Sequence, residues 1–575
     1  MRQISIQKTI ELLGKKSIVF SGLLVLVLVV SSSVAIADTE VLENNEETVP
    51  SLAPVNPDFV IYQQDKIFSQ SEFALDGNKT GFIPPTVDLS HLRSIPAVSG
   101  PFSSNYDLRA LNRVTSVKNQ NNSGVCWAFA TYGSLESYLM PEENWNFSEN
   151  NMKNLLSSAY PEGFDRNANE GGNHLESTAY LVRWSGPVDE NDDPYDPDSN
   201  VSPQDLSLQK HVQNVLFLPN RQGSLNNDGI KWAVQNYGAV YTSMYYNDTF
   251  YSPATASYYY NNTSLTNHAV AIVGWNDSFD KSKFSEAPPG DGAFIVRNSW
   301  GADWGENGYF YVSYYDSKIG CYNSVFTAES PDNYELIYQY DPLGWTNSLG
   351  YEVDNTTAWG ANIFTAKSDE LLKAVSFYTT DSGCNYEIYI YTDPVLGPIS
   401  QTGPVFSENG STSVAGYHTI PLDSDVRLTA GQNFSVVLNL TNIEYEYPIA
   451  IEEPLSGDDG DSSKATANSG HSFISSSGEA WADIITIYPN TSVCIKAFTD
   501  LYVPVFPGYT SSPTDLDHDG LYEDINGNGG LDFDDVVAYY VNMDWIEENA
   551  TVSLFDYNNN DNIDFDDVVI LYDII

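Results

Sequence analysis

The chain contains 575 residues, with 77 acidic and 25 basic side chains and a formal net charge of -52. A chain of this length is too long to fold around a single hydrophobic core, and a length of ~150 residues per domain predicts three or four domains. So few basic residues exclude nucleic acid as a partner, because phosphate binding requires concentrated lysine and arginine.

Residues 1–37 have the pattern of a secretory signal peptide. Basic residues precede an apolar run over residues 18–30, and Ala35 and Ala37 supply the small residues of a cleavage site. An uncleaved N-terminal anchor is the alternative, although the run is shorter than the ~20 residues that span a bilayer. N-x-S/T sequons along the chain also suit export. We therefore expect a secreted protein, and association with the cell surface is compatible with that location.

Residues 38–104 form a polar, proline-bearing N-terminal segment. Only residues 81–92 (GFIPPTVDLSHL) are strongly patterned. The position of the segment resembles that of a propeptide, although the segment is short and lacks a long helical pattern.

Three short stretches, far apart in the chain, carry the parts of one reaction: residues 120–127 (QNNSGVCW), 267–274 (NHAVAIVG) and 297–308 (RNSWGADWGENG). A thiol attacks only as thiolate, so this chemistry needs a cysteine, an imidazole, a group that orients the imidazole and an oxyanion donor. The candidates for these roles are Cys126, His268, Asn298 and Gln120. The sequence therefore predicts a cysteine-type peptidase that needs no cofactor for catalysis.

Helix-forming spacing follows Cys126, and Pro141 stops the run. Cys126 should therefore lie at a helix N-terminus, where the helix dipole favours the thiolate. Alternating and β-branched residues after position 238 predict strands. A helical half would then carry the nucleophile, and a sheet half the base.

The motifs resemble the papain family of cysteine peptidases, in which a similar distance separates cysteine and histidine; here it is 142 positions. The resemblance implies an α+β, two-lobed fold for residues 105–330 and an oxyanion hole formed by Gln120 and the main-chain N–H of Cys126. It also implies that Trp300 shields the His268–Asn298 hydrogen bond from water.

The same resemblance implies the substrate-binding residues Gly171, Gly172 and Trp300, with the two glycines allowing close approach of an extended peptide backbone. Two departures from the family concern the shape of the cleft. Ser123 stands where the family has a disulfide cysteine, and residues 277–292 form an insertion before Asn298. Peptides and proteins are the implied substrates.

Residues 332–500 contain short strand-like runs separated by turns, which predict an all-β sandwich. Residues 338–345 (YQYDPLGW) and 358–364 (AWGANIF) resemble a lectin-like domain that follows the peptidase in some secreted papain homologues. The resemblance implies a glycan or cell-envelope ligand. Trp345 and Trp359 are candidates for stacking on sugar rings, and burial in the core is the alternative for both.

The chain has four cysteines. If Cys126 is a free nucleophile, three remain, so at least one other is unpaired. A disulfide between Cys384 and Cys494 is our preferred pairing, because both lie in the predicted sandwich, and two buried thiols are the alternative.

A linker, residues 501–513, leads to an acidic module, residues 514–575, in which two segments repeat 32 positions apart. Each places oxygen ligands at loop positions one, three, five, seven, nine and twelve, the pattern that Ca²⁺ requires. The first loop has Asp524, Asn526, Asn528, Gly530, Asp532 and Asp535; the second has Asp556, Asn558, Asn560, Asn562, Asp564 and Asp567. A further candidate site combines Asp515, Asp517 and Asp519 with Asp524.

The paired loop-helix repeats resemble a dockerin, which implies structural Ca²⁺ and a cohesin-like protein partner. A solvated acidic tail is the alternative, but tails do not repeat with apolar helices attached. The predicted fold class is therefore multidomain: a papain-like α+β peptidase, an all-β lectin-like sandwich and a small α calcium-loop domain.

Three functions follow from these features. The first is a secreted or cell-surface papain-like endopeptidase that acts through a cysteine thioester and is targeted by the accessory modules. The second is a papain-fold adhesion or binding protein with little or no peptidase activity. The third is a papain-fold acyl transferase that passes the acyl group to an amine.

Overall fold

The computed structural model describes residues 49–68, 80–93, 100–351, 354–455, 462–517 and 519–575. The predicted signal peptide lies outside these residues, as does part of the propeptide-like segment. Within the described residues, no helix is both long and apolar enough to cross a membrane.

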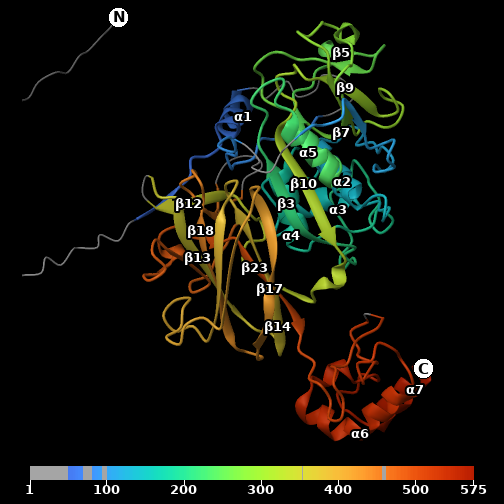
Figure 1. The fold of residues 1–575 in the computed structure, drawn as a ribbon, viewed down its shortest axis with the longest axis vertical. Helices are drawn as coiled ribbons and strands as arrows, with labels where there is room; N and C mark the ends of the chain where they lie inside the picture. The colour runs from blue at the N-terminus through green and yellow to red at the C-terminus, as the bar shows by residue number, and fades with distance from the viewer. Residues whose placement is uncertain (1–48, 69–79, 94–99, 352–353, 456–461, 518) are drawn as a thin grey trace, which may run out of the picture. The chain divides into compact units, whose positions relative to one another are not determined.

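The helical half of the predicted peptidase region, called the peptidase region below, contains α2 (Cys126–Leu139), α3 (Glu149–Leu155) and α4 (His174–Val182) (Figure 1). α2 consists largely of small and apolar residues, and almost all of its side chains are buried. The side-chain oxygens of Ser148 and Asn173 cap α3 and α4 by accepting N–H groups of the first turn. Helix α5 (Asp228–Tyr237) packs against the sheet half.

The sheet half is antiparallel through most of its width. Its central strands, in spatial order, are β3 (His211–Leu218), β10 (Cys321–Glu329), β4 (Val240–Met244), β7 (His268–Asn276), β8 (Ala293–Arg297) and β9 (Tyr309–Ser313). β2 (Asn105–Asp107) pairs with β7, and β6 (Ser257–Tyr258) and β5 (Tyr251–Ser252) extend the sheet beyond β9. α2 packs across β7 and β10, so the sheet carries the helix that begins with Cys126.

The following region is all-β. One sheet contains β16 (Phe406–Ser411), β15 (Asn385–Thr392), β18 (Asn433–Thr441), β13 (Thr357–Thr365), β20 (Ser472–Ser475) and β21 (Ala482–Asp483). A smaller sheet contains β1 (Pro50–Leu52), β12 (Asn347–Tyr351), β19 (Ile449–Glu452) and β22 (Ser492–Val493). The remaining strands are β11 (Leu336–Tyr338), β23 (Ile495–Leu501), β14 (Glu370–Thr379) and β17 (Gly416–Leu428).

These remaining strands join the two regions. β17 pairs with β3, with Tyr417 opposite Val215, so the peptidase sheet continues directly into the all-β region. Arg183, at the end of α4, donates to the main-chain oxygen of Pro342 at 2.8 Å. A buried ion pair between Lys496 and Asp341, 2.8 Å apart, lies in the all-β region next to Pro342. The joint is therefore part of the core.

The C-terminal region contains α6 (Phe533–Asn549) and α7 (Phe565–Ile574), which pack against each other. Both helices begin with a capping box, formed by Asp532 with Asp535 and by Asp564 with Asp567. A separate apolar cluster, which includes Ile525 and Phe555, fills the space between helices and loops. Short 3-10 turns occur at Asp248–Phe250, Lys281–Lys283, Pro331–Asn333, Ile484–Thr486 and Val552–Leu554.

For Trp345, burial in the core, which the sequence offered as the alternative to stacking on a sugar ring, is confirmed, so a stacking role for this ring is wrong. Its side chain is only 2% exposed, its Nε1 donates to Ser348 Oγ at 2.9 Å, and its ring packs near Phe217 of β3. Trp359 is partly exposed, but its ring stacks on Tyr389 at 5.8 Å, and a Cβ atom at Gly478 would come within 2.8 Å of it. Much of the Trp359 ring is therefore already covered.

The preferred disulfide between Cys384 and Cys494 is also wrong. All four cysteines are free thiols. Cys384 Sγ contacts the main-chain oxygen of Asn385, and Cys494 Sγ contacts that of Gly344. The two cysteines lie in different core clusters, so the alternative of two buried thiols is confirmed.

Candidate active site

Cys126 is the first residue of α2 and is completely buried. Its Sγ accepts a hydrogen bond from the main-chain N–H of Ala269 at 3.3 Å. Burial raises the pKa of the thiol to about 12, and N–H groups of Ala269, Gly81 and Trp127 oppose this shift. In the state described here, the thiol is therefore protonated.

His268 is the first residue of β7, immediately before the Ala269 N–H that contacts the sulfur. Its Nε2 lies 2.8 Å from Asn298 Oδ1, and burial lowers the imidazole pKa to about 4. Its Nδ1 has no hydrogen-bond partner among the described residues. Because Asn298 engages Nε2, Nδ1 is the nitrogen left to exchange a proton with the thiol.

Aromatic rings cover this histidine. The indole of Trp300 stacks on the His268 ring with centroids 4.8 Å apart, and Trp304 packs edge-on against Trp300 at 5.1 Å. Trp300 itself is buried. This packing excludes water from the His268–Asn298 hydrogen bond, which strengthens the bond. Trp300 therefore covers the His268 ring, and its role in substrate binding stays a prediction.

Gln120 is held beside this group. Its Nε2 donates to the main-chain oxygen of Ser123 at 2.7 Å, and its Oε1 accepts from Ser299 Oγ at 2.5 Å. Ser299 follows Asn298, and its N–H donates to Asn298 Oδ1 at 2.9 Å. The four predicted catalytic side chains are thus brought together in one place, while their roles remain predictions.

The N-terminal segment occupies the backbone edge at Gly171 and Gly172, which is the predicted binding site for substrate and is called the substrate edge below. Gly81 and Phe82 both donate their N–H groups to the main-chain oxygen of Asn267, at 3.1 and 3.0 Å. Ile83 N–H donates to Gly172 O at 3.1 Å, and Gly172 N–H donates to Gly81 O at 3.0 Å. A Cβ atom at Gly81 would lie 1.9 Å from Gly124 O, so only glycine fits beside the nucleophile. Gly172 therefore pairs with an extended chain, but that chain is the protein's own.

The same N-terminal segment is anchored outside the cleft. β1 pairs with β12 of the all-β region, and α1 (Pro57–Phe68) follows it. Tyr322 of β10 donates to Asp58 Oδ2 at 2.8 Å and accepts from Asn56 Nδ2 at 3.1 Å. His91 lies 2.7 Å from Thr380 O and stacks on Tyr445. The segment thus bridges the peptidase and all-β regions.

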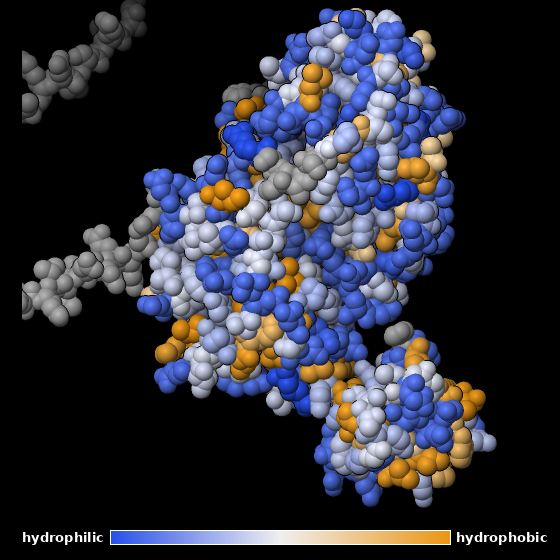
Figure 2. Space-filling view, viewed as in Figure 1, coloured by the Kyte–Doolittle hydropathy of each residue, from blue (hydrophilic) through white to orange (hydrophobic). Residues whose placement is uncertain are grey.

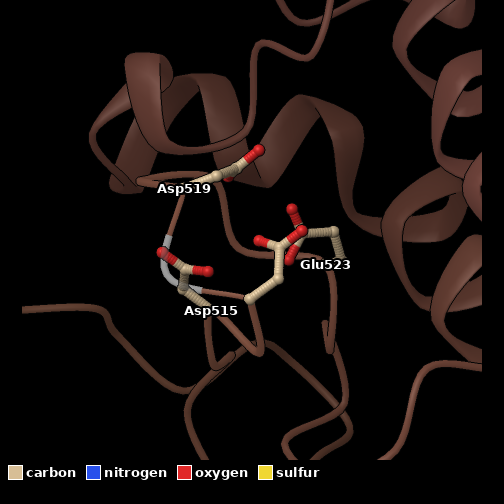
Figure 3. A group of neighbouring side chains, drawn as sticks. Asp515, Asp519 and Glu523 are labelled. Atoms are coloured by element: carbon tan, nitrogen blue, oxygen red, sulfur yellow. The ribbon is translucent and has the colours of Figure 1, made fainter. Parts of the chain in front are cut away.

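The C-terminal module contains an acidic cluster. The carboxylates of Asp515, Asp517, Asp519 and Glu523 offer oxygens that lie within 4.8 Å of one another, and Figure 3 shows three of them directed toward a common space. Asp524, which the sequence pattern placed in this group, turns away and accepts from Thr514 Oγ1 and the N–H groups of Asn528 and Gly529. Glu523 replaces it; alternation of side-chain direction between neighbours is the signal that could have found it.

The two predicted calcium loops share one arrangement. In each, the acidic side chains at positions one and twelve accept loop N–H groups: Asp524 and Asp535 in the first loop, Asp556 and Asp567 in the second. All four of these residues are buried. Burial raises the pKa of Asp535 and that of Asp567. Burial also raises the pKa of Glu523, to about 7. The remaining predicted ligands lie on the same loops. The donor set of carboxylate and amide oxygens fits Ca²⁺.

Comparison with known proteins assigns two consecutive parts of the chain to two different families. Residues 102–328 match a family profile described as papain family cysteine protease, and residues 337–499 match one described as lectin like domain. A viral cathepsin of Antheraea pernyi nuclear polyhedrosis virus is 30% identical over 291 residues, which are 50% of this chain and 80% of that protein. A cysteine protease of Blomia tropicalis is 28% identical over 233 residues, which are 39% of this chain and 66% of the relative's length.

Two solved structures extend the likeness through both regions. One contains the cysteine protease and lectin-like domains of Cwp84, a surface layer associated protein of Clostridium difficile; its TM-score is 0.68 at 24% identity, over 79% of this chain and 98% of that one. The other is a clostridial Cwp84 variant after propeptide cleavage, with a TM-score of 0.61 at 27% identity, over 70% of this chain and 100% of that one. The predicted order of an α+β half and an all-β lectin-like region is confirmed.

We expect Gln120→Ala to lower kcat by roughly 10²- to 10³-fold, as loss of one oxyanion donor does. Asn298→Ala should have a smaller effect, because it disorders the imidazole without removing a reacting group. Steady-state hydrolysis of a peptide substrate measures both. Gln222→Ala, at an exposed glutamine, is the matched control, and equal kcat for Gln120→Ala and Gln222→Ala would contradict the oxyanion role.

Proposed function

Because the chain belongs to the papain family of cysteine proteases, we propose that it is a secreted or cell-surface endopeptidase that cuts proteins through a Cys126 thioester. The observation that carries the proposal is the shared placement of Cys126, His268 and Asn298, in which Asn298 holds one imidazole nitrogen and the other is left for the thiol. The proposed location rests on the signal-peptide pattern and on similarity to a surface layer associated protein.

In the proposed reaction, His268 Nδ1 accepts the thiol proton, and sulfur forms a bond to the substrate carbonyl carbon. The Cys126 N–H and Gln120 stabilise the oxyanion. The imidazolium then gives its proton to the leaving amine as the C–N bond breaks, which leaves a thioester. Water attacks the thioester while His268 takes a proton from it, and the free acid and thiol result.

The N-terminal segment would hold this machinery inactive. It pairs with Gly172, where a substrate backbone would bind, and it buries the thiol. With the pKa of Cys126 at about 12 and that of His268 at about 4, a thiolate–imidazolium pair is disfavoured in the covered state. Release of the segment would admit water and bring the two pKa values closer together.

The decisive experiment replaces the nucleophile. After proteolytic release of the N-terminal segment, the wild-type protein should cleave a peptide library and take up one epoxide inhibitor on Cys126. Cys126→Ala, treated in the same way, should lose hydrolysis and keep its melting behaviour, and His268→Ala should also lose hydrolysis. Cys321→Ala is the matched thiol control. Equal hydrolysis by wild type and Cys126→Ala would refute the peptidase. A folded wild type that shows no hydrolysis after release of the segment would favour the adhesion protein, and a peptide product joined to an added amine would favour the acyl transferase.

Phe82 tests the inhibitory role of the N-terminal segment. Its side chain is 3% exposed and packs 5.3 Å from the Tyr322 ring. Phe82→Ala removes contacts worth about 3–5 kcal/mol for a buried phenylalanine, so we expect epoxide labelling of Cys126 to become roughly 10²-fold faster. Val60→Ala, at an exposed position in α1 of the same segment, should label like wild type. Labelling of Phe82→Ala at the wild-type rate would mean that the segment does not block the thiol.

For the lectin-like region, we propose a targeting role with a glycan or cell-envelope ligand. The match to a lectin-like profile supports it. Because Trp345 is buried and Trp359 is largely covered, sugar stacking by these two rings has little support. Binding to glycans would have to use other partly exposed groups of the region.

For the C-terminal module, we propose structural Ca²⁺ and docking to a cohesin-like protein. Residues 511–575 have 17 Asp and Glu and no Lys or Arg, so the four buried aspartates of the two loops have no cationic partner within the module. The ligands proposed for Ca²⁺ are the loop residues together with Asp515, Asp517, Asp519 and Glu523. Bound Ca²⁺ would neutralise these carboxylates and hold the loops.

An apolar face on the same module supports docking. Apolar residues at equivalent positions of the repeat are exposed: Phe533 and Phe565, Val537 and Val569, Tyr540 and Tyr572. Phe533 packs edge-on against Tyr572, and Tyr540 against Phe565, so the two helices contribute to one face. Figure 2 shows hydrophobic colouring gathered over this module. Contiguous exposed apolar surface marks protein interaction sites.

Without Ca²⁺, we expect the module to lose stability as pH rises. Burial raises the Glu523 pKa from 4.5 to about 7, so the folded module favours the protonated form, and its contribution is lost as pH rises from about 4.5 through 7. Ca²⁺ should remove this loss by binding the carboxylates. Circular dichroism melting of the full chain with Ca²⁺ and with chelator, at pH 5 and pH 8, measures the effect.

Two variants make that experiment specific to the loops. Asp524→Asn should weaken Ca²⁺ stabilisation, because it removes a buried charge at position one of the first loop. Asp544→Asn, at an exposed acidic residue of α6, should melt like wild type. Identical melting of wild type in Ca²⁺ and in chelator at pH 8 would show that the module is not a calcium-dependent fold.

A further inference from the structure

Arg166 is a completely buried cation beneath the substrate edge. Its side chain has no exposed surface, and its Nε donates to Glu176 Oε2 at 2.9 Å. A buried arginine is costly unless its N–H groups are satisfied. Here they are used to hold main chain. Nη1 donates to three carbonyl oxygens of the following loop: Asn167 at 3.0 Å, Ala168 at 3.5 Å and Glu170 at 3.3 Å.

The loop that Arg166 holds leads directly into Gly171 and Gly172. Gly172 packs so tightly that a Cβ atom there would lie 2.7 Å from the Trp127 ring and 3.0 Å from Glu176 Oε2. Glu176, the partner of Arg166, therefore also lies against Gly172, the residue that pairs with an extended chain. Asn173 completes this link, because its Oδ1 caps α4 while its Nδ2 donates to Glu176 Oε1 at 3.1 Å.

Arg166 also reaches the helix of the nucleophile. Its guanidinium lies over the ring of Trp127, 4.5 Å from the centroid, and Trp127 follows Cys126 in α2. Nη2 donates to the main-chain oxygen of Lys153 in α3 at 3.2 Å. One planar group thus contacts the substrate edge, the nucleophile helix and a neighbouring helix. A guanidinium can do this because its five donors project in fixed directions.

No covalent bond supports the same loop, since all four cysteines are free. Asn169 of this loop makes the other described hydrogen bonds to the residues that precede Cys126. Ser123 Oγ donates to the Asn169 side chain at 3.2 Å, and Gly124 N–H donates to its main-chain oxygen at 2.9 Å. These contacts involve the loop centre and not Gly172. Beside the hydrogen bond from Thr131 of α2 to Ser177 of α4, at 2.8 Å, the Arg166–Glu176 pair and the Trp127 ring therefore tie Gly172 to the helix that begins with Cys126.

We propose that Arg166 is a positioning residue, which sets the Gly172 edge at its working distance from Cys126 so that an extended substrate is presented to the thiol. The inference rests on the proposed peptidase function. Arg166 touches no reacting atom, so its loss should weaken binding of substrates long enough to pair with Gly172 and should spare substrates that end beside Cys126. Misplacement of a substrate by about 1 Å can cost 10²-fold in rate.

The test compares two substrates after proteolytic release of the N-terminal segment, because that segment otherwise pairs with Gly172. A tripeptide amide reaches Gly172, whereas a single-residue ester does not. In Arg166→Lys, which keeps the charge but not the planar fork, we expect KM for the tripeptide to rise roughly 10- to 100-fold, with kcat and the ester reaction changed by less than about threefold. Rates are divided by the concentration of Cys126 that an epoxide titrates, so unfolded protein does not count.

Arg183→Lys is the matched control, because Arg183 is another buried arginine that donates to main-chain carbonyls, of Glu162 and Pro342, away from the cleft. It should leave the ratio of tripeptide to ester activity unchanged. Glu176→Gln, which keeps the side-chain shape, should raise tripeptide KM in the same direction by a smaller factor, and it carries the test if Arg166→Lys cannot be titrated.

An equal fall in activity on the tripeptide and on the ester, or an equal change of their activity ratio in Arg183→Lys, would overturn the positioning role of Arg166. Neither result would contradict the proposed peptidase function. A wild-type protein that cleaves neither substrate after release of the segment would instead refute the proposed function, and with it this inference.

Discussion

The contact between Ala269 N–H and Cys126 Sγ, at 3.3 Å, joins the two halves of the reaction. It exists only because α2 lies across β7, which requires a helix of small and apolar residues that can be buried on nearly every side. The positions of His268, of the Asn298 amide and of the Trp300 indole, to which we assign roles in catalysis only as predictions, then follow from β7 and the chain after β8. Catalytic geometry here is a consequence of packing between a helix and a sheet.

The sequence was informative where chemistry restricts residue type at short spacing. Cys126, His268 and Asn298 could be identified because a thiol, an imidazole and an amide each lie in a distinctive local pattern, and the structure brings them together. The all-β region could be predicted because alternation and turns are local signals. The acidic repeats were equally visible, since two copies of one loop-helix pattern reveal each other.

The sequence was silent where partners are distant in the chain. Nothing in residues 81–83 indicated pairing with Gly172 and Asn267, because a main-chain hydrogen bond carries no side-chain signature. For the same reason the pairing of β17 with β3 could not be foreseen. The error at Cys384 came from pairing two thiols before knowing which strands meet, and the same ignorance left Trp345 undecided between the surface and the core.

The crowding at Gly81 has a genetic consequence. A Cβ atom there would lie 1.9 Å from the Gly124 oxygen, and the neighbouring atom is backbone, which cannot rotate aside. Every missense change of a glycine codon adds at least that atom. All such alleles would therefore displace residues 81–83 from Cys126 while the chain folds, and under the proposed secretion this would happen inside the cell that makes the protein. Purifying selection should consequently act on codon 81 as strongly as on codon 126. A substitution at codon 81 adds an atom for which there is no space, whereas a substitution at codon 126 removes the thiol.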